Sequence, residues 1–198
     1  MNFSAINQLK IKEAFSDNSK FQQVKVDDDF LKELFECATR GTLFVYDEPL
    51  IGHSIYIEDT SGLGRDKVLV INNSDHKEVF LWHIDGVLYK KNSKCDCAIL
   101  TESIFDLVEF KTDAANDSDK SKEYNYTKSK DQLLLTLQDI SDRCMSVGIN
   151  LRDFVNIEAY SVFNRTVPQN DALRKQISAS FLLESKGIKL KFENCINL

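Results

Sequence analysis

Hydrophobic and polar residues follow two patterns along this chain, and each pattern predicts one kind of secondary structure. Apolar residues at helical spacing predict helices over 27–38, 129–147 and 171–185. Short runs of β-branched and aromatic residues predict strands. These runs are LFVY, SIYI, KVLVIN, EVFLWHI and CAIL between Thr42 and Leu100, followed by 105–111, 154–163 and 188–192. The order of the elements predicts a mixed α/β fold in which helices flank a central mixed β-sheet.

Local signals set the boundaries of the predicted helices. The helix over 27–38 opens with three acidic residues and ends before Gly41, and the helix over 129–147 opens with the capping-box pattern Ser129–Gln132. Residues 112–129 hold almost no aliphatic side chains and many Asp, Lys and Ser residues. They predict a polar, flexible insertion within one domain that spans residues 1–198.

Composition narrows the class of protein. A chain of 198 residues with 42% hydrophobic content is expected to form one soluble globular domain. The net charge of −6 excludes a histone-like coat for nucleic acid. Five cysteines, an odd number, favour a reducing cytoplasm over a disulfide scaffold. No apolar run reaches the length of a spanning helix, and the opening residues contain no signal-peptide core, so we expect a cytoplasmic protein with no membrane partner.

Three charges interrupt apolar strands. Glu109 and Lys111 lie on the strand over 105–111, on the same face as Phe105 and Leu107. Asp96 interrupts the preceding run, KCDCAIL, in the same way. Because an unpaired buried charge is costly, these side chains are expected to meet partners, a metal ion or solvent in a cleft.

The three charges together indicate a chemistry. Two carboxylates on adjacent strands, Asp96 and Glu109, offer hard oxygen ligands for Mg²⁺ or Mn²⁺. The ammonium of Lys111 can stabilise the negative charge that develops on a phosphodiester. This combination favours hydrolytic phosphoryl chemistry.

The same residues resemble a family signature. Asp96 followed by Glu109-Phe110-Lys111 resembles the Asp…Glu-x-Lys motif of the PD-(D/E)XK nuclease superfamily, which has the restriction-endonuclease-like fold. That core consists of a helix, a three-strand meander, a helix and a strand, and residues 27–163 supply this order. The resemblance implies metal ligands at Asp96 and Glu109 and a catalytic role for Lys111. Cys95 stands where the name-giving proline would be, and a long acidic insertion follows Lys111.

The resemblance also implies two supporting residues. Family members often carry an acidic residue on the first helix, which here would be Glu33 or Glu36. They also carry a Gln or Lys at the start of the helix after the lysine strand, which here would be Gln132.

Each site residue also has a plainer interpretation. Glu109 and Lys111 could mark a strand end that emerges into solvent, and Asp96 could pair with Lys94 or Lys91. The capping box alone explains Gln132, and a solvated helix face explains Glu33 and Glu36. The cysteines favour buried thiols over a zinc site, and the three histidines do not have the spacing of metal ligands.

Charge is unevenly divided along the chain. Residues 165–198 carry six basic and three acidic side chains, whereas the rest is strongly acidic. Arg174 and Lys175 are therefore the predicted contacts to a substrate backbone. The leading hypothesis is a metal-dependent nuclease acting on nucleic acid, with DNA preferred to RNA. The alternatives are an inactive nuclease-fold module that binds a protein partner or a second copy of the chain, and an unrelated α+β protein.

Overall fold

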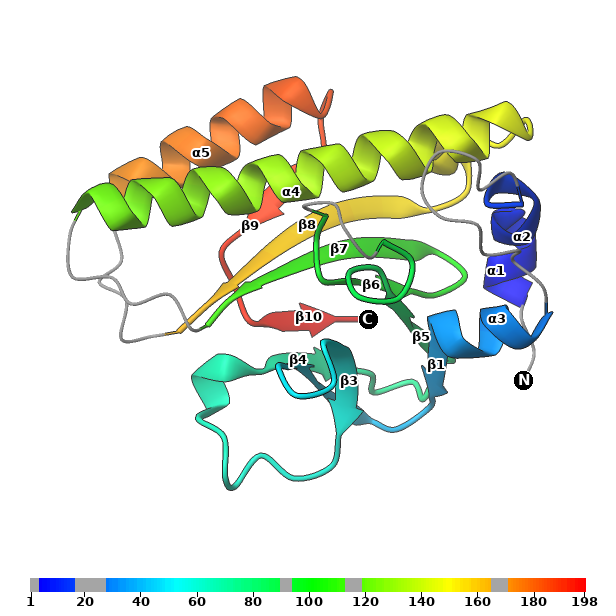
Figure 1. Cartoon of the computed structure of the whole chain (residues 1–198), viewed down its shortest axis with the longest axis horizontal. Helices are drawn as coiled ribbons and strands as arrows, with labels where there is room; N and C mark the ends of the chain where they lie inside the picture. The colour runs from blue at the N-terminus through cyan, green and yellow to red at the C-terminus, as the bar shows by residue number, and fades with distance from the viewer. Residues whose placement is uncertain (1–3, 17–27, 90–93, 113–118, 165–170) are drawn as a thin grey trace.

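The protein is a mixed α/β structure with two β-sheets. A computed structural model describes residues 4–16, 28–89, 94–112, 119–164 and 171–198. The larger sheet lies in the middle, with the long helices α4 and α5 over one face and the smaller sheet beside the other (Figure 1). These layers enclose two hydrophobic cores, a helix-side core and an inter-sheet core.

The larger sheet has six strands in the order β1-β5-β6-β7-β8-β9. The strands from β1 to β7 pair antiparallel in that order, and β7, β8 and β9 are parallel. Their bounds are β1 Phe35–Ala38, β5 Val79–His83, β6 Cys97–Leu100, β7 Ile104–Lys111, β8 Asn156–Phe163 and β9 Lys189–Lys191.

The smaller sheet has the order β10-β4-β2-β3, in which β10 runs parallel to β4. Its strands are β2 Thr42–Glu48, β3 His53–Ile57, β4 Leu69–Asn72 and β10 Cys195–Asn197. The helices are α1 Ser4–Gln8, α2 Ile11–Ala14, α3 Asp28–Leu34, α4 Asp119–Ser146 and α5 Asp171–Glu184, with 3-10 turns at Arg65–Lys67 and Leu151–Asp153.

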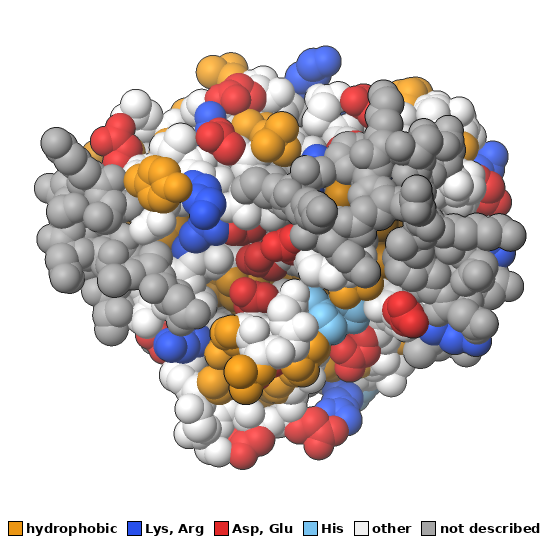
Figure 2. Space-filling model, in the orientation of Figure 1, with side chains coloured by type: hydrophobic (Ala, Val, Ile, Leu, Met, Phe, Trp, Pro, Cys, Tyr) orange, Lys and Arg blue, Asp and Glu red, His pale blue; other side chains and the backbone are white. Residues whose placement is uncertain are grey.

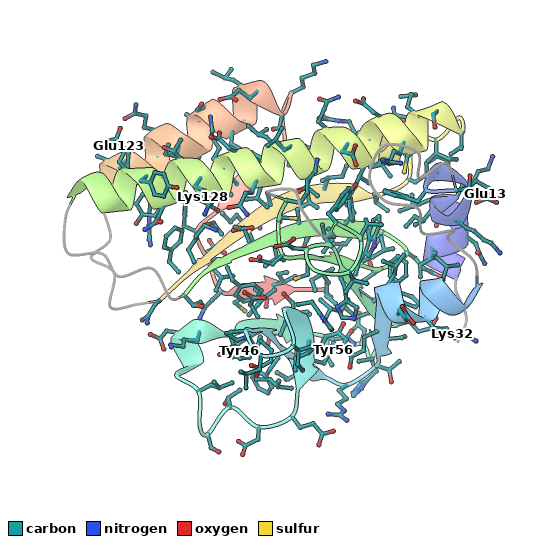
Figure 3. The ribbon with its side chains drawn as sticks, in the orientation of Figure 1. Glu13, Lys32, Tyr46, Tyr56, Glu123 and Lys128 are labelled. Atoms are coloured by element: carbon teal, nitrogen blue, oxygen red, sulfur yellow. The ribbon has the colours of Figure 1, made fainter. Side chains whose placement is uncertain are left out.

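Strand β7 is covered on both faces, as its sequence predicts. Phe105 and Leu107 belong to the helix-side core, whereas Val108 and Phe110 belong to the inter-sheet core. Tyr56 of β3 (Figure 3) donates its hydroxyl to the carbonyl of Val79 in β5 at 3.1 Å. The smaller sheet is thus fixed to the larger one by packing and by a hydrogen bond across the layers.

The predicted helix over 27–38 is wrong in its last turn. Helix α3 ends at Leu34, and the next four residues form β1 against β5, with Phe35 opposite Trp82. The two rings lie 5.2 Å apart between centroids, and Phe35 is buried. Pairing with a neighbouring strand therefore overrides the local helical spacing.

The predicted flexible insertion is wrong for residues 119–129, which form the first turns of α4, while residues 113–118 lie outside the described residues. Tyr126 anchors this polar part of the helix, because its ring is fully buried 4.7 Å from that of Phe163 and 5.1 Å from that of Phe192. The predicted capping box is wrong as well. Ser129 lies inside α4, and its Oγ is 2.5 Å from Oγ of Ser161.

Candidate active site

The start of β6 brings Asp96 close to Glu109. Asp96 is the bend residue directly before β6, next to the Cys97–Val108 pair, and it lies near enough to Glu109 for the two charges to repel each other. Its backbone N–H donates to the carbonyl of Val108 at 3.1 Å, and its Oδ2 accepts the N–H of Phe110 at 2.5 Å. The carboxylate of Asp96 is thereby fixed next to the end of β7.

Helix α4 and β7 bring three further polar groups together. The ammonium of Lys111 contacts Oε1 of Glu109 and donates to Oε1 of Gln132 at 3.0 Å. Nε2 of Gln132 donates in turn to the carbonyl of Lys94 at 2.9 Å. Glu109 is 1% exposed and Gln132 8%, so neither a strand end in solvent nor a helix cap describes them. Lys94 uses its ammonium for the carbonyl of Leu135, at 2.9 Å.

Glu109 has one oxygen that the fold leaves unsatisfied. Oε1 contacts Lys111, whereas Oε2 is buried and has no hydrogen-bond partner among the described residues. A buried carboxylate oxygen without a partner is destabilising, and native proteins keep few of them. The orphan oxygen therefore marks a place where a ligand would complete the structure.

Two more carboxylates surround the pair. Asp47 of β2 and Asp85, which follows β5, lie near enough to influence the charge of Glu109. We call Asp47, Asp85, Asp96 and Glu109 the acidic cluster. Acidic side chains gather in a hollow at the middle of the face seen in Figure 2, with basic and histidine side chains at its edge. The ammonium of Lys111 offsets only part of this negative charge.

Burial and mutual repulsion shift the titration of the cluster. Burial raises the pKa of Glu109 to about 7, although Lys111 opposes the shift. Loss of hydration and the nearby Glu109 hold the pKa of Asp96 well above its usual range, although Asp96 keeps part of its surface accessible. A cation at this place would favour the ionised form of both groups.

The donor set fits a hard divalent cation that keeps part of its water shell. Among the described residues, no three His, Cys, Asp or Glu side chains form a ready-made cage for a metal ion. Asp96 and Glu109 nevertheless provide two carboxylates that lie near enough to repel each other, one with an unsatisfied oxygen. Mg²⁺ is commonly bound by one or two carboxylates, with water and substrate oxygens completing its shell.

The other residues singled out in the sequence lie elsewhere. Glu33 is exposed on α3, and Glu36 lies on β1, where its Oε2 accepts the N–H of Tyr56 at 3.4 Å. Arg174 of α5 packs over Tyr126 and donates to its hydroxyl at 3.1 Å, while Lys175 is exposed on α5. The structure does not bring these residues to the acidic cluster.

Sequence reasoning missed the contributions of Asp47 and Asp85, as well as the environment of His83. The ring of His83, in β5 opposite Cys97, lies 4.7 Å from that of His53 between centroids. Burial of the ring, and to a smaller extent repulsion from the charge of His53, lower the pKa of His83 to about 4. No local pattern reveals that Asp47 belongs here, because it reaches the cluster through the packing of the two sheets.

Comparisons with known protein families, with curated proteins and with solved structures find no significant match. In the described part of the chain, no helix has both the length and the apolar character needed to cross a membrane.

Proposed function

We propose that this protein is a metal-dependent nuclease that hydrolyses phosphodiester bonds in nucleic acid, with DNA preferred to RNA. The observation that carries the proposal is the convergence at the end of β7. Lys111 contacts both Glu109 and Gln132, Asp96 lies near enough to Glu109 for their charges to repel, and Oε2 of Glu109 remains unsatisfied.

The chain topology supports this proposal. Helix α3 is followed, after β1 to β4, by the antiparallel strands β5, β6 and β7; helix α4 comes next, and β8 then pairs parallel to β7. This order is the one that the resemblance to the PD-(D/E)XK superfamily implies, namely a helix, a three-strand meander, a helix and a strand. Asp96 lies at the start of β6 and Glu109-Phe110-Lys111 at the end of β7, and this supports the proposal.

Asp96 and Glu109 would hold the divalent ion, Mg²⁺ or Mn²⁺. When bound, such an ion polarises a phosphoryl oxygen and makes water a stronger nucleophile. The carboxylates of Asp96 and Glu109 fix its place, and the unsatisfied Oε2 gains a partner.

Lys111 and Gln132 would act on the substrate and on each other. The ammonium of Lys111 is the one cation in contact with Glu109 among the described residues, and it can donate to the phosphate as negative charge builds up during attack by water. Gln132 positions that ammonium by accepting one of its hydrogen bonds while its own amide is fixed on the carbonyl of Lys94.

A metal titration of nuclease activity tests the proposal. Purified protein is assayed on single- and double-stranded DNA and RNA with increasing Mg²⁺ or Mn²⁺, for the wild type and for Glu109→Ala. We expect cleavage that requires the metal and is lost in Glu109→Ala. Asp106→Asn serves as the matched control, because it changes a buried carboxylate on the opposite face of the same strand.

Two outcomes would contradict the proposal. One is a folded wild-type protein that cleaves no nucleic acid with either metal. The other is cleavage by Glu109→Ala at the wild-type rate, which would assign the activity to another site or to a contaminant.

A further inference from the structure

A cleft along α4 shares Gln132 with the candidate active site. It has a volume of about 240 Å³. The side chains that line it are Tyr124, Thr127, Lys128, Asp131, Gln132 and Leu135. Tyr124, Lys128 and Gln132 are spaced four residues apart, so they form one stripe along the helix. We call these three residues the α4 stripe.

The α4 stripe ends at the catalytic groups. Gln132 lines the cleft and also accepts the hydrogen bond from Lys111 at 3.0 Å. Figure 3 labels Lys128 on α4, and Figure 2 shows basic side chains at the edge of the acidic hollow. A ligand that lies along the stripe would therefore reach the Glu109–Lys111 pair.

The other two members of the stripe are open to a ligand. The side chain of Tyr124 is 64% exposed, so its ring is accessible to a ligand. Lys128 is exposed and makes no ion pair with any described residue. Asp131 in the same cleft lies 3.6 Å from Lys130, which also binds Glu184 at 2.8 Å. Lys130 thus offsets part of the negative charge of Asp131. Among the described residues, no carboxylate forms an ion pair that offsets the positive charge of Lys128.

An exposed aromatic ring followed by a cation is a way to bind single-stranded nucleic acid. Unpaired bases stack on aromatic side chains, and lysines neutralise the backbone phosphates. The bases of a duplex are stacked on each other and paired, so they do not present a free face to Tyr124. The acidic cluster repels a polyanion, and Lys128 supplies attraction beside it.

We propose that the α4 stripe binds a single-stranded segment of nucleic acid and directs it to Glu109 and Lys111, with a base stacked on Tyr124 and a phosphate on Lys128. This inference rests on the proposed nuclease function, and it specifies the form of the substrate. The strand runs along α4, and its phosphate beyond Lys128 reaches Gln132 and Lys111.

Binding measurements test this inference apart from cleavage. Fluorescence anisotropy of a labelled oligodeoxythymidylate, its RNA counterpart and a duplex of equal length is recorded with EDTA, in a Glu109→Gln background that does not cleave. We expect Tyr124→Ala to weaken binding of the single strands about 5- to 150-fold, since a stacked base contributes about 1 to 3 kcal/mol. Tyr124→Phe, which keeps the ring, is expected to bind like the parent.

The charge of Lys128 has its own test. Lys128→Gln is expected to weaken single-strand binding several-fold and to reduce the slope of log affinity against log salt by about 0.7, the value for one phosphate contact on a single strand. Lys186→Gln is the matched control, because this exposed lysine lies past the end of α5 and is expected to change neither quantity.

The outcomes separate this inference from the proposed function. Unchanged single-strand binding in Tyr124→Ala, equal loss in Tyr124→Phe, or equally tight duplex binding through Tyr124 would overturn the inference. If Glu109-dependent cleavage persists in that case, the nuclease proposal stands alone. If the Tyr124 and Lys128 effects appear but no metal-dependent cleavage is found, the α4 stripe is a binding site and the nuclease proposal fails.

Discussion

Strand β7 carries two buried acidic side chains, and their surroundings differ. Asp106, 3% exposed, points into the inter-sheet side, and burial raises its pKa to about 7. Glu109, three residues later, points to the opposite face and has the same raised pKa for the same main reason. Burial and an altered pKa are thus shared by both carboxylates.

The partners of the two carboxylates distinguish them. Near Asp106, Nζ of Lys191 donates to Oε2 of Glu158 at 2.5 Å and to the hydroxyl of Tyr160 at 3.1 Å. The backbone of Glu158 forms a hydrogen bond with Asp106. No oxygen of Asp106 is both buried and without a partner, in contrast to Oε2 of Glu109. Asp106, Glu158, Tyr160 and Lys191 also line a cavity of about 430 Å³, so the Asp106 group is open as well. The two carboxylates therefore differ in hydrogen bonding, since Glu109 alone keeps a buried oxygen without a partner.

The largest expected difference concerns the two lysines. Lys111→Ala is expected to lower the cleavage rate by about 10² to 10³, or about 3 to 4 kcal/mol, because it removes one preorganised donor to the reacting phosphate. Lys191→Ala removes an equal charge from the Asp106 group and is expected to leave the rate per folded molecule unchanged. Single-turnover cleavage rates check both. Equal losses would show that general charge, and not position, matters.

The second difference is in stability. Asp106 binds a proton more tightly in the folded state, so the native protein holds more protons than the unfolded chain between pH 3.8 and about 7. The free energy of unfolding contributed by this group therefore falls as pH rises through that window. Asp106→Asn should remove roughly 2 to 4 kcal/mol of that decline. Urea unfolding of both proteins at several pH values measures this pH dependence. The charged and titratable groups around Asp106, which are Glu158, Tyr160, Lys189 and Lys191, are the same in both proteins.

If the unfolding free energy changes with pH in the same way for the wild type and for Asp106→Asn, Asp106 ionises in the folded protein as it does in the unfolded chain. Its surroundings would then differ less from those of an exposed carboxylate than the structure indicates.

The third difference is in metal affinity. Glu109→Gln keeps the shape of the side chain but removes its charge, so Mn²⁺ affinity should fall at least about tenfold. Asp106→Asn makes the same chemical change on the other face and is expected to keep wild-type affinity. Calorimetric titration with Mn²⁺ decides the matter, and equal affinities for all three proteins would place the metal elsewhere.

The smallest expected effect belongs to Gln132. Gln132→Ala removes the acceptor that positions Lys111, and a hydrogen bond to a charged group contributes about 1.5 to 3 kcal/mol, so cleavage should slow by about 10- to 150-fold. The loss is expected in kcat and not in KM. A purely structural role would instead affect stability, so a large drop in unfolding free energy with normal kcat would contradict the positioning role.

The sequence predicted those elements whose pattern is set locally. Strand β7 alternates apolar side chains toward two cores, and this pattern was enough to place it in the middle of the structure. The runs that became β2 to β6 were also predicted, but not their division between two sheets, because strand partners are set by packing far along the chain. Strand β1 was missed for the same reason, since Phe35 fits helical spacing equally well.

The candidate site was predictable only in part. The alternation of side chains along β7 predicted that Glu109 and Lys111 share one face. The hydrophobic run before β7 in the sequence contains Asp96, the second predicted carboxylate. The role of Gln132 was obscured by the capping-box pattern, because Tyr126 and its aromatic neighbours extend α4 in a way that the polar sequence over 119–129 does not indicate. Asp47 comes from the smaller sheet, whose place no local pattern specifies.

Helix α4 also fixes the distance between the two ends of the α4 stripe. Eight residues separate Tyr124 from Gln132 in an uninterrupted helix of 28 residues, and at 1.5 Å per residue this distance is about 12 Å. A stacked strand that rises about 3.4 Å per nucleotide would cover it with about three or four nucleotides. The helix would thus set a shortest useful substrate, and fragments below that length would leave the protein uncut.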